Sequence, residues 1–128
     1  MSRIRISSGA KWEELVGYSR AVRVGNTIEV AGTTAMVAGE LQGINNPYQQ
    51  TKVIFQIIEQ ALIEAGASLQ DVVRTRMFVT NIEAHWEDIG RAHGEFFSAI
   101  KPSSTMVEVS KLIDPRMLIE IEVTAIVA

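Results

Sequence analysis

Apolar and polar residues alternate in several short stretches of the chain, and this period of two predicts β-strands. Five strands are expected, at residues 21–24, 27–31, 71–79, 105–109 and 118–127. Gly25 and Asn26 separate the first two strands, and both residue types tolerate the positive φ angles of a two-residue hairpin turn. The glycine-containing segment that follows, residues 32–46, is expected to be flexible.

Apolar residues recur at helical spacing in two other places. The first stripe follows Pro47, which suits a first helical position, and it stops at Gly66, a residue typical of helix ends. The second helix is expected from about Trp86 to Ile100, before Pro102. The resulting order, β-β-α-β-α-β-β, predicts an α+β fold with both helices on one face of a mixed sheet. We find no linker or repeat, so residues 1–128 are expected to form a single domain.

The last strand has two different faces. Ile119, Ile121, Val123, Ala125 and Val127 are expected to point toward the helices. The opposite face mixes apolar residues with Glu120 and Glu122, and Arg74 and Arg76 share one face of the strand at 71–79. Opposite charges among apolar residues suit the inner lining of an oligomer, where such charges can pair. The alternative is an ordinary solvated sheet face.

Composition excludes several classes of protein. The chain has 128 residues, of which 47% are apolar, and it has no cysteine, so disulfides and thiolate chemistry are excluded. Neither a signal peptide nor an apolar run long enough to span a membrane is present, so we expect a cytoplasmic protein. The net charge of −3 and the scattered basic residues argue against nucleic acid as a partner.

The common active-site motifs are missing. Without a GxGxxG or P-loop sequence, a nucleotide cofactor is not indicated. His85 and His93 are not flanked as metal ligands are, and no G-x-S-x-G stretch is present. His93 lies on the apolar stripe of its helix, which is typical of a packed or interface histidine.

Short sequence stretches, mostly at loops and strand ends, resemble the Rid superfamily, the reactive intermediate deaminases that are also called YjgF-like. The similar stretches are residues 17–21, 25–26, 31–32, 64–73, 78–82, 95–97, 107–109 and 119–122. They follow the family's order over almost the whole chain. The resemblance implies a chorismate-mutase-like fold of the Bacillus type, assembled as a homotrimer with a central barrel and with small-metabolite clefts between subunits.

The resemblance also implies a chemistry. Deaminating members hydrolyse enamines and imines such as 2-aminoacrylate to ketoacids and ammonia, without metal or cofactor. An arginine holds the substrate carboxylate, a glutamate positions water and a tyrosine lines the cleft. Such roles are chemically sensible, because guanidinium binds carboxylate in a bidentate manner and a carboxylate can direct water onto a C=N carbon.

Only part of this machinery is retained. Tyr18 and Glu120 match the tyrosine and the glutamate, but Ser104 stands at the arginine position. Ala31 and Gly90 replace a serine and an asparagine of the family. The candidate site is therefore Glu120 as the catalytic residue, with substrate-binding residues Tyr18, Gly32, Thr33, Ser104 and Thr105.

The loss of the arginine has a cost. Hydrogen bonds to charged groups are worth roughly 1.5–3 kcal/mol each, so losing a bidentate pair slows a reaction by roughly two or more orders of magnitude. We therefore do not expect efficient deamination of 2-aminoacrylate. Arg76 or Arg91 could compensate, or both could be structural charges. Glu120 could be catalytic, or it could form an ion pair with Arg74 or Arg76.

Two functions remain open on this basis. The first is a cofactor-independent deaminase or hydrolase acting on a small imine, enamine or related metabolite, including the aminomuconate-type compounds of ring-cleavage pathways. The second is a non-catalytic metabolite-binding or regulatory trimer. A third, RNA cleavage or translation inhibition, rests on labels given to relatives, and the acidic composition argues against it.

Overall fold

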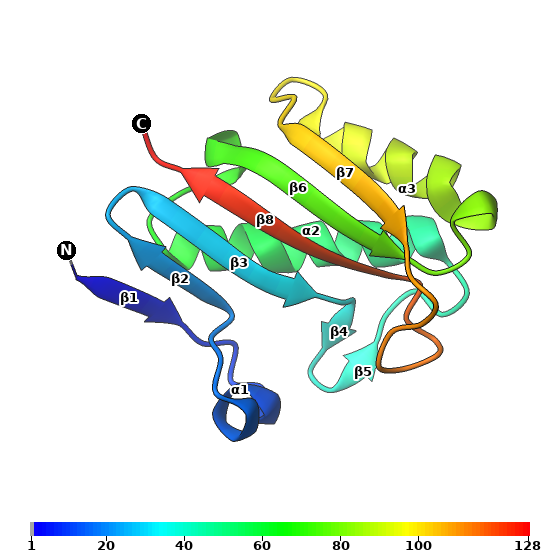
Figure 1. The fold of residues 1–128 in the computed structure, drawn as a ribbon, viewed down its shortest axis with the longest axis horizontal. Coiled ribbons are helices and arrows are strands. Elements are labelled where there is room, and N and C mark those ends of the chain that lie inside the picture. The colour runs from blue at the N-terminus through cyan, green and yellow to red at the C-terminus, as the bar shows by residue number, and fades with distance from the viewer. Residues whose placement is uncertain (1) are drawn as a thin grey trace.

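A mixed sheet of six strands forms the centre of the molecule, and its two long helices lie together on one face (Figure 1). The computed structural model describes residues 2–128. Along the sheet the strands are β1 (Arg3–Ile6), β2 (Ala21–Val24), β3 (Thr27–Thr33), β8 (Ile119–Ile126), β6 (Val72–Val79) and β7 (Ser103–Glu108). Neighbouring strands are antiparallel except for β6 and β7, which are parallel. This arrangement confirms the predicted α+β class and the helices on one face.

Helix α2 (Pro47–Glu64) begins and ends where the sequence predicts. Asn46 accepts a hydrogen bond from the Gln49 amide at 3.0 Å, and Pro47 occupies the first turn. After the helix, Gly66 has a φ angle of +83°, a conformation that residues with a Cβ rarely adopt. Helix α3 (Ile82–Phe97) begins and ends earlier than predicted, because its polar first turn lies outside the apolar stripe.

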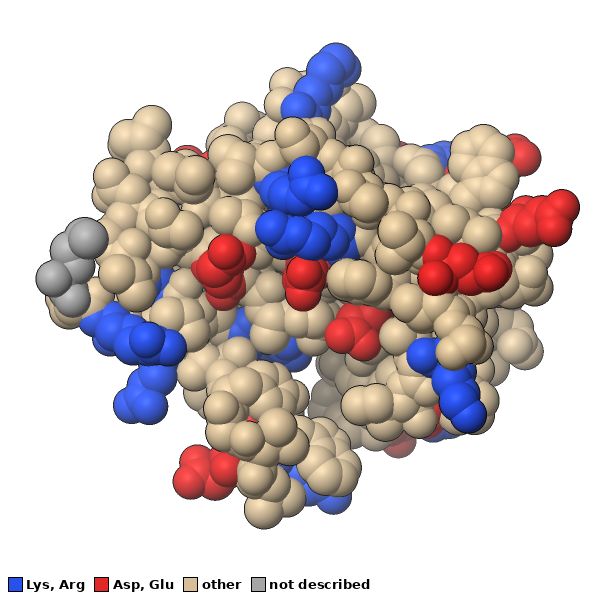
Figure 2. Space-filling view, in the orientation of Figure 1, with Lys and Arg blue, Asp and Glu red and all other residues tan. Residues whose placement is uncertain are grey.

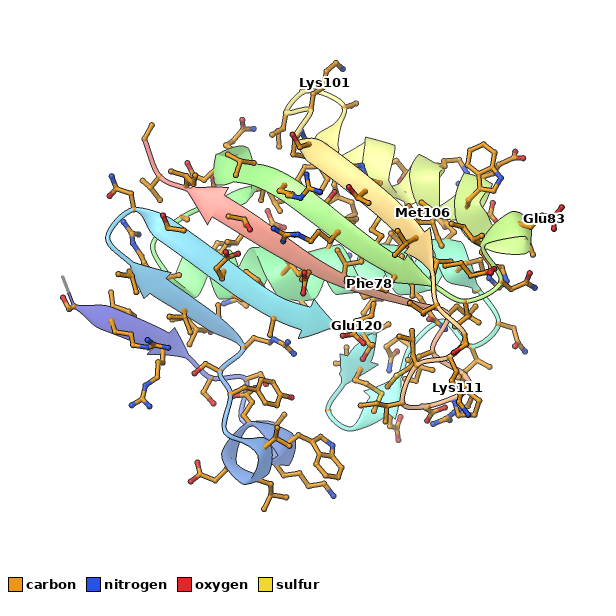
Figure 3. The ribbon with its side chains drawn as sticks, viewed as in Figure 1. Phe78, Glu83, Lys101, Met106, Lys111 and Glu120 are labelled. Atoms are coloured by element: carbon orange, nitrogen blue, oxygen red, sulfur yellow. The ribbon has the colours of Figure 1, made fainter. Side chains whose placement is uncertain are left out.

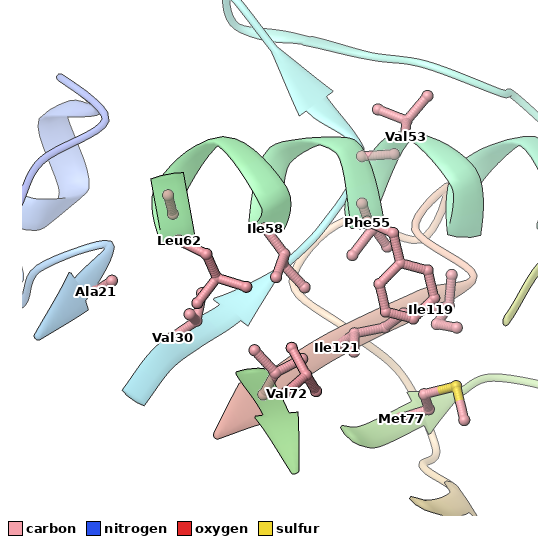
Figure 4. Close-up of a cluster of buried hydrophobic side chains, with 14 of the residues drawn as sticks. Ala21, Val30, Val53, Phe55, Ile58, Leu62, Val72, Met77, Ile119 and Ile121 are labelled. Carbon is pink, nitrogen blue, oxygen red and sulfur yellow. The ribbon is translucent and has the colours of Figure 1, made fainter. Parts of the chain in front are cut away.

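The core lies between α2 and the helix-facing side of the sheet (Figure 4). The inward residues of β8 are completely buried: Ile119, Ile121, Val123 and Ala125. From α2 they meet a set of equally buried side chains: Ile54, Phe55, Ile58 and Leu62. The predicted inner face of the last strand is therefore confirmed, and Val127 packs at its edge.

The sequence prediction missed two elements at the N-terminus. Strand β1 pairs antiparallel with β2, and a short helix α1 (Lys11–Val16) follows it. Helix α1 has no side-chain N-cap, but Glu13 ties it to the preceding loop by accepting hydrogen bonds from Ser7 Oγ at 3.0 Å and from Ser8. Neither element is long enough to show a clear hydrophobic period, so the pattern gave no signal.

The expectation of a flexible segment at residues 32–46 is wrong. Strand β3 continues to Thr33, and β4 (Met36–Val37) and β5 (Glu40–Leu41) then form a small hairpin. Leu41 is buried in the main core, which anchors this hairpin. The 3₁₀ turn Leu69–Asp71 precedes β6, so that strand begins one residue later than predicted, while β7 begins two residues earlier. Within the described residues, no helix has the length and apolarity needed to cross a membrane.

Strand β3 contains a β-bulge where it passes β8. Val30 pairs with Val123, but the next paired residue is Thr33 with Ile121, so β3 carries one extra residue there. Val30 and Thr33 are consequently both buried. The extra residue leaves Ala31 and Gly32 together between two inward-facing positions.

Candidate functional site

Glu120 lies near the start of β8, on the open face of the sheet that the helices do not cover (Figure 3). Its Oε2 atom occupies the space that a Cβ atom would take at Gly32, and its Cδ would be 3.0 Å from that Cβ. On its other side Glu120 pairs with Phe78 of β6. The β-bulge therefore has a local purpose, because it presents a residue without a side chain to the half-buried carboxylate.

Arg20 lies behind this pair, immediately before β2. Its Nη2 donates a hydrogen bond of 2.6 Å to the carbonyl oxygen of Gly32, and its buried Nε has no partner among the described residues. Its charge interacts with Tyr18, Glu13 and Glu120. Arg20 is thus a half-buried cation that holds the bulge in place and acts electrostatically on Glu120.

The environment changes the acidity of Glu120. Burial raises the pKa of its carboxyl, Arg20 opposes this rise and Glu122 adds to it, with a net pKa above the ordinary value. A carboxyl with a raised pKa both accepts and donates protons more readily near neutral pH than an exposed glutamate does. The site therefore provides one group suited to proton transfer.

Tyr18 lines a broad hollow on the same open face (Figure 2). This hollow measures about 1220 Å³ and also contains Ala31, Arg76 and Glu122. It is larger and more open than a usual small-molecule pocket. Helix α1 beside it exposes several large apolar side chains: Trp12, Leu15 and Val16. Such a concave face suits contact with another chain better than it suits enclosure of a metabolite by one chain.

The other predicted site residues lie apart from Glu120 within one chain. Thr33 points into the core and donates its hydroxyl to the Ala31 carbonyl at 2.8 Å. Thr105 and Ser104 are neighbours on β7, so they face opposite sides of the sheet. Thr105 accepts a hydrogen bond of 2.9 Å from Arg74 on the open face, whereas Ser104 bonds to Thr75 on the helix side.

The arginines considered as substitutes are already engaged. Arg76 lies 3.6 Å from Glu122, and Arg74 bonds to Thr105, so the predicted ion pair of either with Glu120 is wrong. Arg91 stacks over the Tyr48 ring at 3.9 Å and also lies close to Asp88 and Glu95.

Some functional features could not be found from the sequence. Arg20 lies within a stretch that resembles the Rid family, but nothing in the pattern shows that it is buried behind Gly32. Among the described residues, no three histidine, aspartate or glutamate side chains gather as metal ligands do.

We expect Gly32→Ala to lower activity with little effect on folding. The new Cβ would occupy the position of the Glu120 carboxylate, which can swing aside because it is the end of a flexible side chain. Displacement of a reacting group by about 1 Å costs on the order of 10- to 100-fold in rate. Gly94→Ala is the control, since a Cβ at Gly94 meets no atom within 4 Å. Equal turnover by the two variants would show that the position of the carboxylate is unimportant.

Comparison with known proteins places this geometry among relatives. The family model described as Endoribonuclease L-PSP matches residues 9–127. An uncharacterized protein of Streptomyces coelicolor is 42% identical over 124 residues, which are 94% of this chain and 90% of that protein. A 2-iminobutanoate/2-iminopropanoate deaminase of Dermatophagoides farinae is 29% identical over 114 residues, 88% of each chain.

A solved structure agrees with the fold. The crystal structure of Rv2704 from Mycobacterium tuberculosis, described as a member of the YjgF/YER057c/UK114 family, superimposes with a TM-score of 0.89. The two chains are 46% identical, and the match covers 98% of this chain and 100% of the other.

Proposed function

The chain belongs to the Endoribonuclease L-PSP family, also known as YjgF or Rid, and from this premise we propose that it hydrolyses a small imine or enamine. The observation that carries the proposal is the Glu120 carboxylate, which is half-buried, raised in pKa and seated against Gly32. The relative named as an iminobutanoate and iminopropanoate deaminase supports this class of substrate. No metal or cofactor is part of the proposed reaction.

The proposed chemistry uses Glu120 twice. As a carboxylate it takes a proton from water while the water oxygen bonds to the carbon of a protonated C=N group. The product is a carbinolamine, and Glu120 then returns its proton to the nitrogen, which leaves as ammonia. A raised pKa favours the second step because the neutral acid is formed more readily.

The proposed substrate is not held by a strong carboxylate clamp. Ser104 occupies the position at which the family resemblance places an arginine, so this chain belongs to a branch that lacks it. A serine provides a single neutral hydrogen bond where an arginine provides a charged fork. Since Arg74, Arg76 and Arg91 have other partners, we propose a neutral or differently oriented substrate.

The proposed active unit is a homotrimer. Glu120 and Ser104 lie on opposite faces of the sheet in one chain, with β6 between their strands. They can serve one metabolite only if two copies contribute to a shared cleft. The paired charges and the exposed apolar side chains of α1 support burial of the open face between copies.

A second candidate is a trimer that binds a metabolite without converting it. The observation that favours it is Ser104 itself, because the chain has lost the group that fixes a carboxylate substrate. RNA cleavage is not proposed, although the family description names an endoribonuclease. Arg74 and Arg76 of the open face are both engaged by other side chains, and the net charge is negative.

We expect Ser104→Arg to accelerate hydrolysis of freshly generated 2-iminopropanoate by roughly 10-fold or more, because it restores a charged hydrogen bond to the carboxylate. Ammonia release and imine decay measure the rate. Ser103→Arg is the matched control, since Ser103 is the exposed neighbour on the opposite face of β7. If neither variant nor the native trimer hydrolyses any imine while metabolites still bind, the non-catalytic candidate is correct.

A further inference from the structure

Three side chains from different elements form a hydrogen-bonded chain at the edge of the sheet. Thr75 Oγ1 on β6 donates a hydrogen bond of 2.8 Å to Ser104 Oγ on β7. The same Thr75 oxygen lies 2.9 Å from Nε2 of His93 on α3. The parallel register of β6 and β7 places Thr75 directly beside Ser104, and α3 covers this side of the strands.

The chain connects the interior to the surface. Thr75 has no exposed surface, His93 is half-buried and Ser104 is exposed. Another buried threonine shows the simpler way to satisfy such a hydroxyl: Thr51 donates to the Pro47 carbonyl one turn earlier in α2, at 2.7 Å. Thr75 instead uses its hydroxyl to link an imidazole with a surface serine.

His93 is the only group of this chain that titrates near neutral pH. Its contacts from neighbouring elements are Phe55 of α2, Thr75 of β6 and Phe97 of its own helix, with ring centroids 5.6 Å away for Phe55 and 4.9 Å for Phe97. None of these contacts carries a charge. Burial lowers the pKa of His93, which keeps the imidazole neutral at neutral pH.

A neutral imidazole gives the chain two directions. With the proton on Nε2, hydrogen bonds run from His93 through Thr75 to Ser104. With the proton on Nδ1, Nε2 accepts, and the hydroxyls of Thr75 and Ser104 can turn so that the bonds run inward. A proton can therefore pass from Ser104 to His93 without movement of a heavy atom.

We propose that Ser104, Thr75 and His93 form a proton relay that opens on β7 and accepts a proton from the bound metabolite. The relay deepens the proposed hydrolysis and rests on it for its place in the reaction. No residue of the proposed Glu120 step removes the hydroxyl proton of the carbinolamine. The relay supplies that acceptor from the neighbouring copy of the chain.

The step balances as follows. The carbinolamine O–H proton passes to Ser104, the proton of Ser104 passes to Thr75 and that of Thr75 passes to Nε2 of His93. The C=O bond forms, the C–N bond breaks and the nitrogen leaves as ammonia with the proton from Glu120. His93 is left as imidazolium and then releases its proton to water.

The first test follows His93 directly by NMR titration of the imidazole nitrogens. The chain has two histidines, and His85, bonded to the Thr80 carbonyl, is the internal reference. We expect Thr75→Val and Ser104→Ala both to shift the His93 titration while His85 stays unchanged. Thr51→Val, which removes an equally buried hydroxyl outside the relay, should leave both histidines unchanged. An unchanged His93 titration in Thr75→Val and Ser104→Ala would overturn the relay.

The second test is kinetic. We expect Thr75→Val and His93→Phe to lower kcat for imine hydrolysis roughly 10-fold or more, and Thr75→Ser, which keeps the hydroxyl, to restore it. The native rate should fall as pH drops through the pKa of His93, and this part of the profile should be lost in His93→Phe. Native kcat and pH profile in Thr75→Val would overturn the proposal. If native protein hydrolyses no imine, the proposed function fails, and the NMR titration alone decides whether the relay exists.

Discussion

Glu120→Gln is expected to lower kcat/KM for imine hydrolysis on the order of 10²- to 10⁴-fold, the usual contribution of a positioned acid or base. The amide keeps the size of the carboxyl group and still fits against Gly32, but it cannot take a proton from water. Ammonia release under saturating and limiting substrate separates an effect on kcat from an effect on KM. We expect the loss in kcat, because the proton transfer occurs in the transition state.

The same variant should not be destabilised at neutral pH. Because burial raises the pKa of Glu120 in the folded protein, the folded state binds its proton more tightly than the unfolded state does. The stabilising effect of this group is complete below its unfolded pKa and is lost as pH rises through the folded pKa. Replacement by a neutral amide removes that loss.

Urea denaturation at pH 7 and at pH 4 tests this expectation. Glu120→Gln should unfold at equal or higher urea concentration than native protein at pH 7, with a smaller difference at pH 4. Glu122→Gln is the comparison, since Glu122 lies on the same face of β8 but is close to Arg76. Unchanged turnover by Glu120→Gln, with the trimer intact, would mean that the carboxylate has no part in the chemistry.

Phe55→Ala is expected to have the largest effect on stability, a loss of about 3–5 kcal/mol. Phe55 is completely buried in α2, and its ring meets Phe97 at 5.1 Å and Phe96 at 5.3 Å between centroids. The truncation leaves a cavity between α2 and α3, and a packed core fills such a cavity only partly. Urea unfolding followed by circular dichroism measures the change.

Ile63→Ala on the same helix is the matched control, because 55% of the Ile63 side chain is exposed. It should change the free energy of unfolding by less than about 1 kcal/mol. Similar midpoints for the two variants would contradict the assignment of Phe55 to the core. Since Phe55 also contacts His93, its truncation should alter the His93 titration as well.

Elements with a long, regular hydrophobic pattern could be predicted from the sequence. The stripe after Pro47 and the alternation in the last strand gave α2 and the buried face of β8, because burial on one side leaves a clear period. Strand β1 and helix α1 could not be predicted in this way. They span four and six residues, and one of the anchors of α1 is a buried carboxylate, Glu13.

The site was partly predictable for a different reason. Glu120 and Tyr18 were identified by resemblance, and the strand pattern placed Glu120 on the outer face. The link from Ser104 through Thr75 to His93 could not be predicted, since it depends on which residues of two parallel strands lie side by side. His93 was interpreted as a packed histidine, and the structure confirms that packing while giving its Nε2 a polar partner.

The bulge in β3 has a consequence for how such chains diverge. Without Ala31, the residues Ile28, Val30 and Thr33 would alternate with outward residues as in any regular strand. Loss of a single codon would therefore leave a strand able to pair with β8 along its whole length. The inner side of the sheet would keep its pattern, and only the close fit of Gly32 to Glu120 would be disturbed. A family built in this way can shed a chemical activity by one deletion and retain the scaffold for a new binding role.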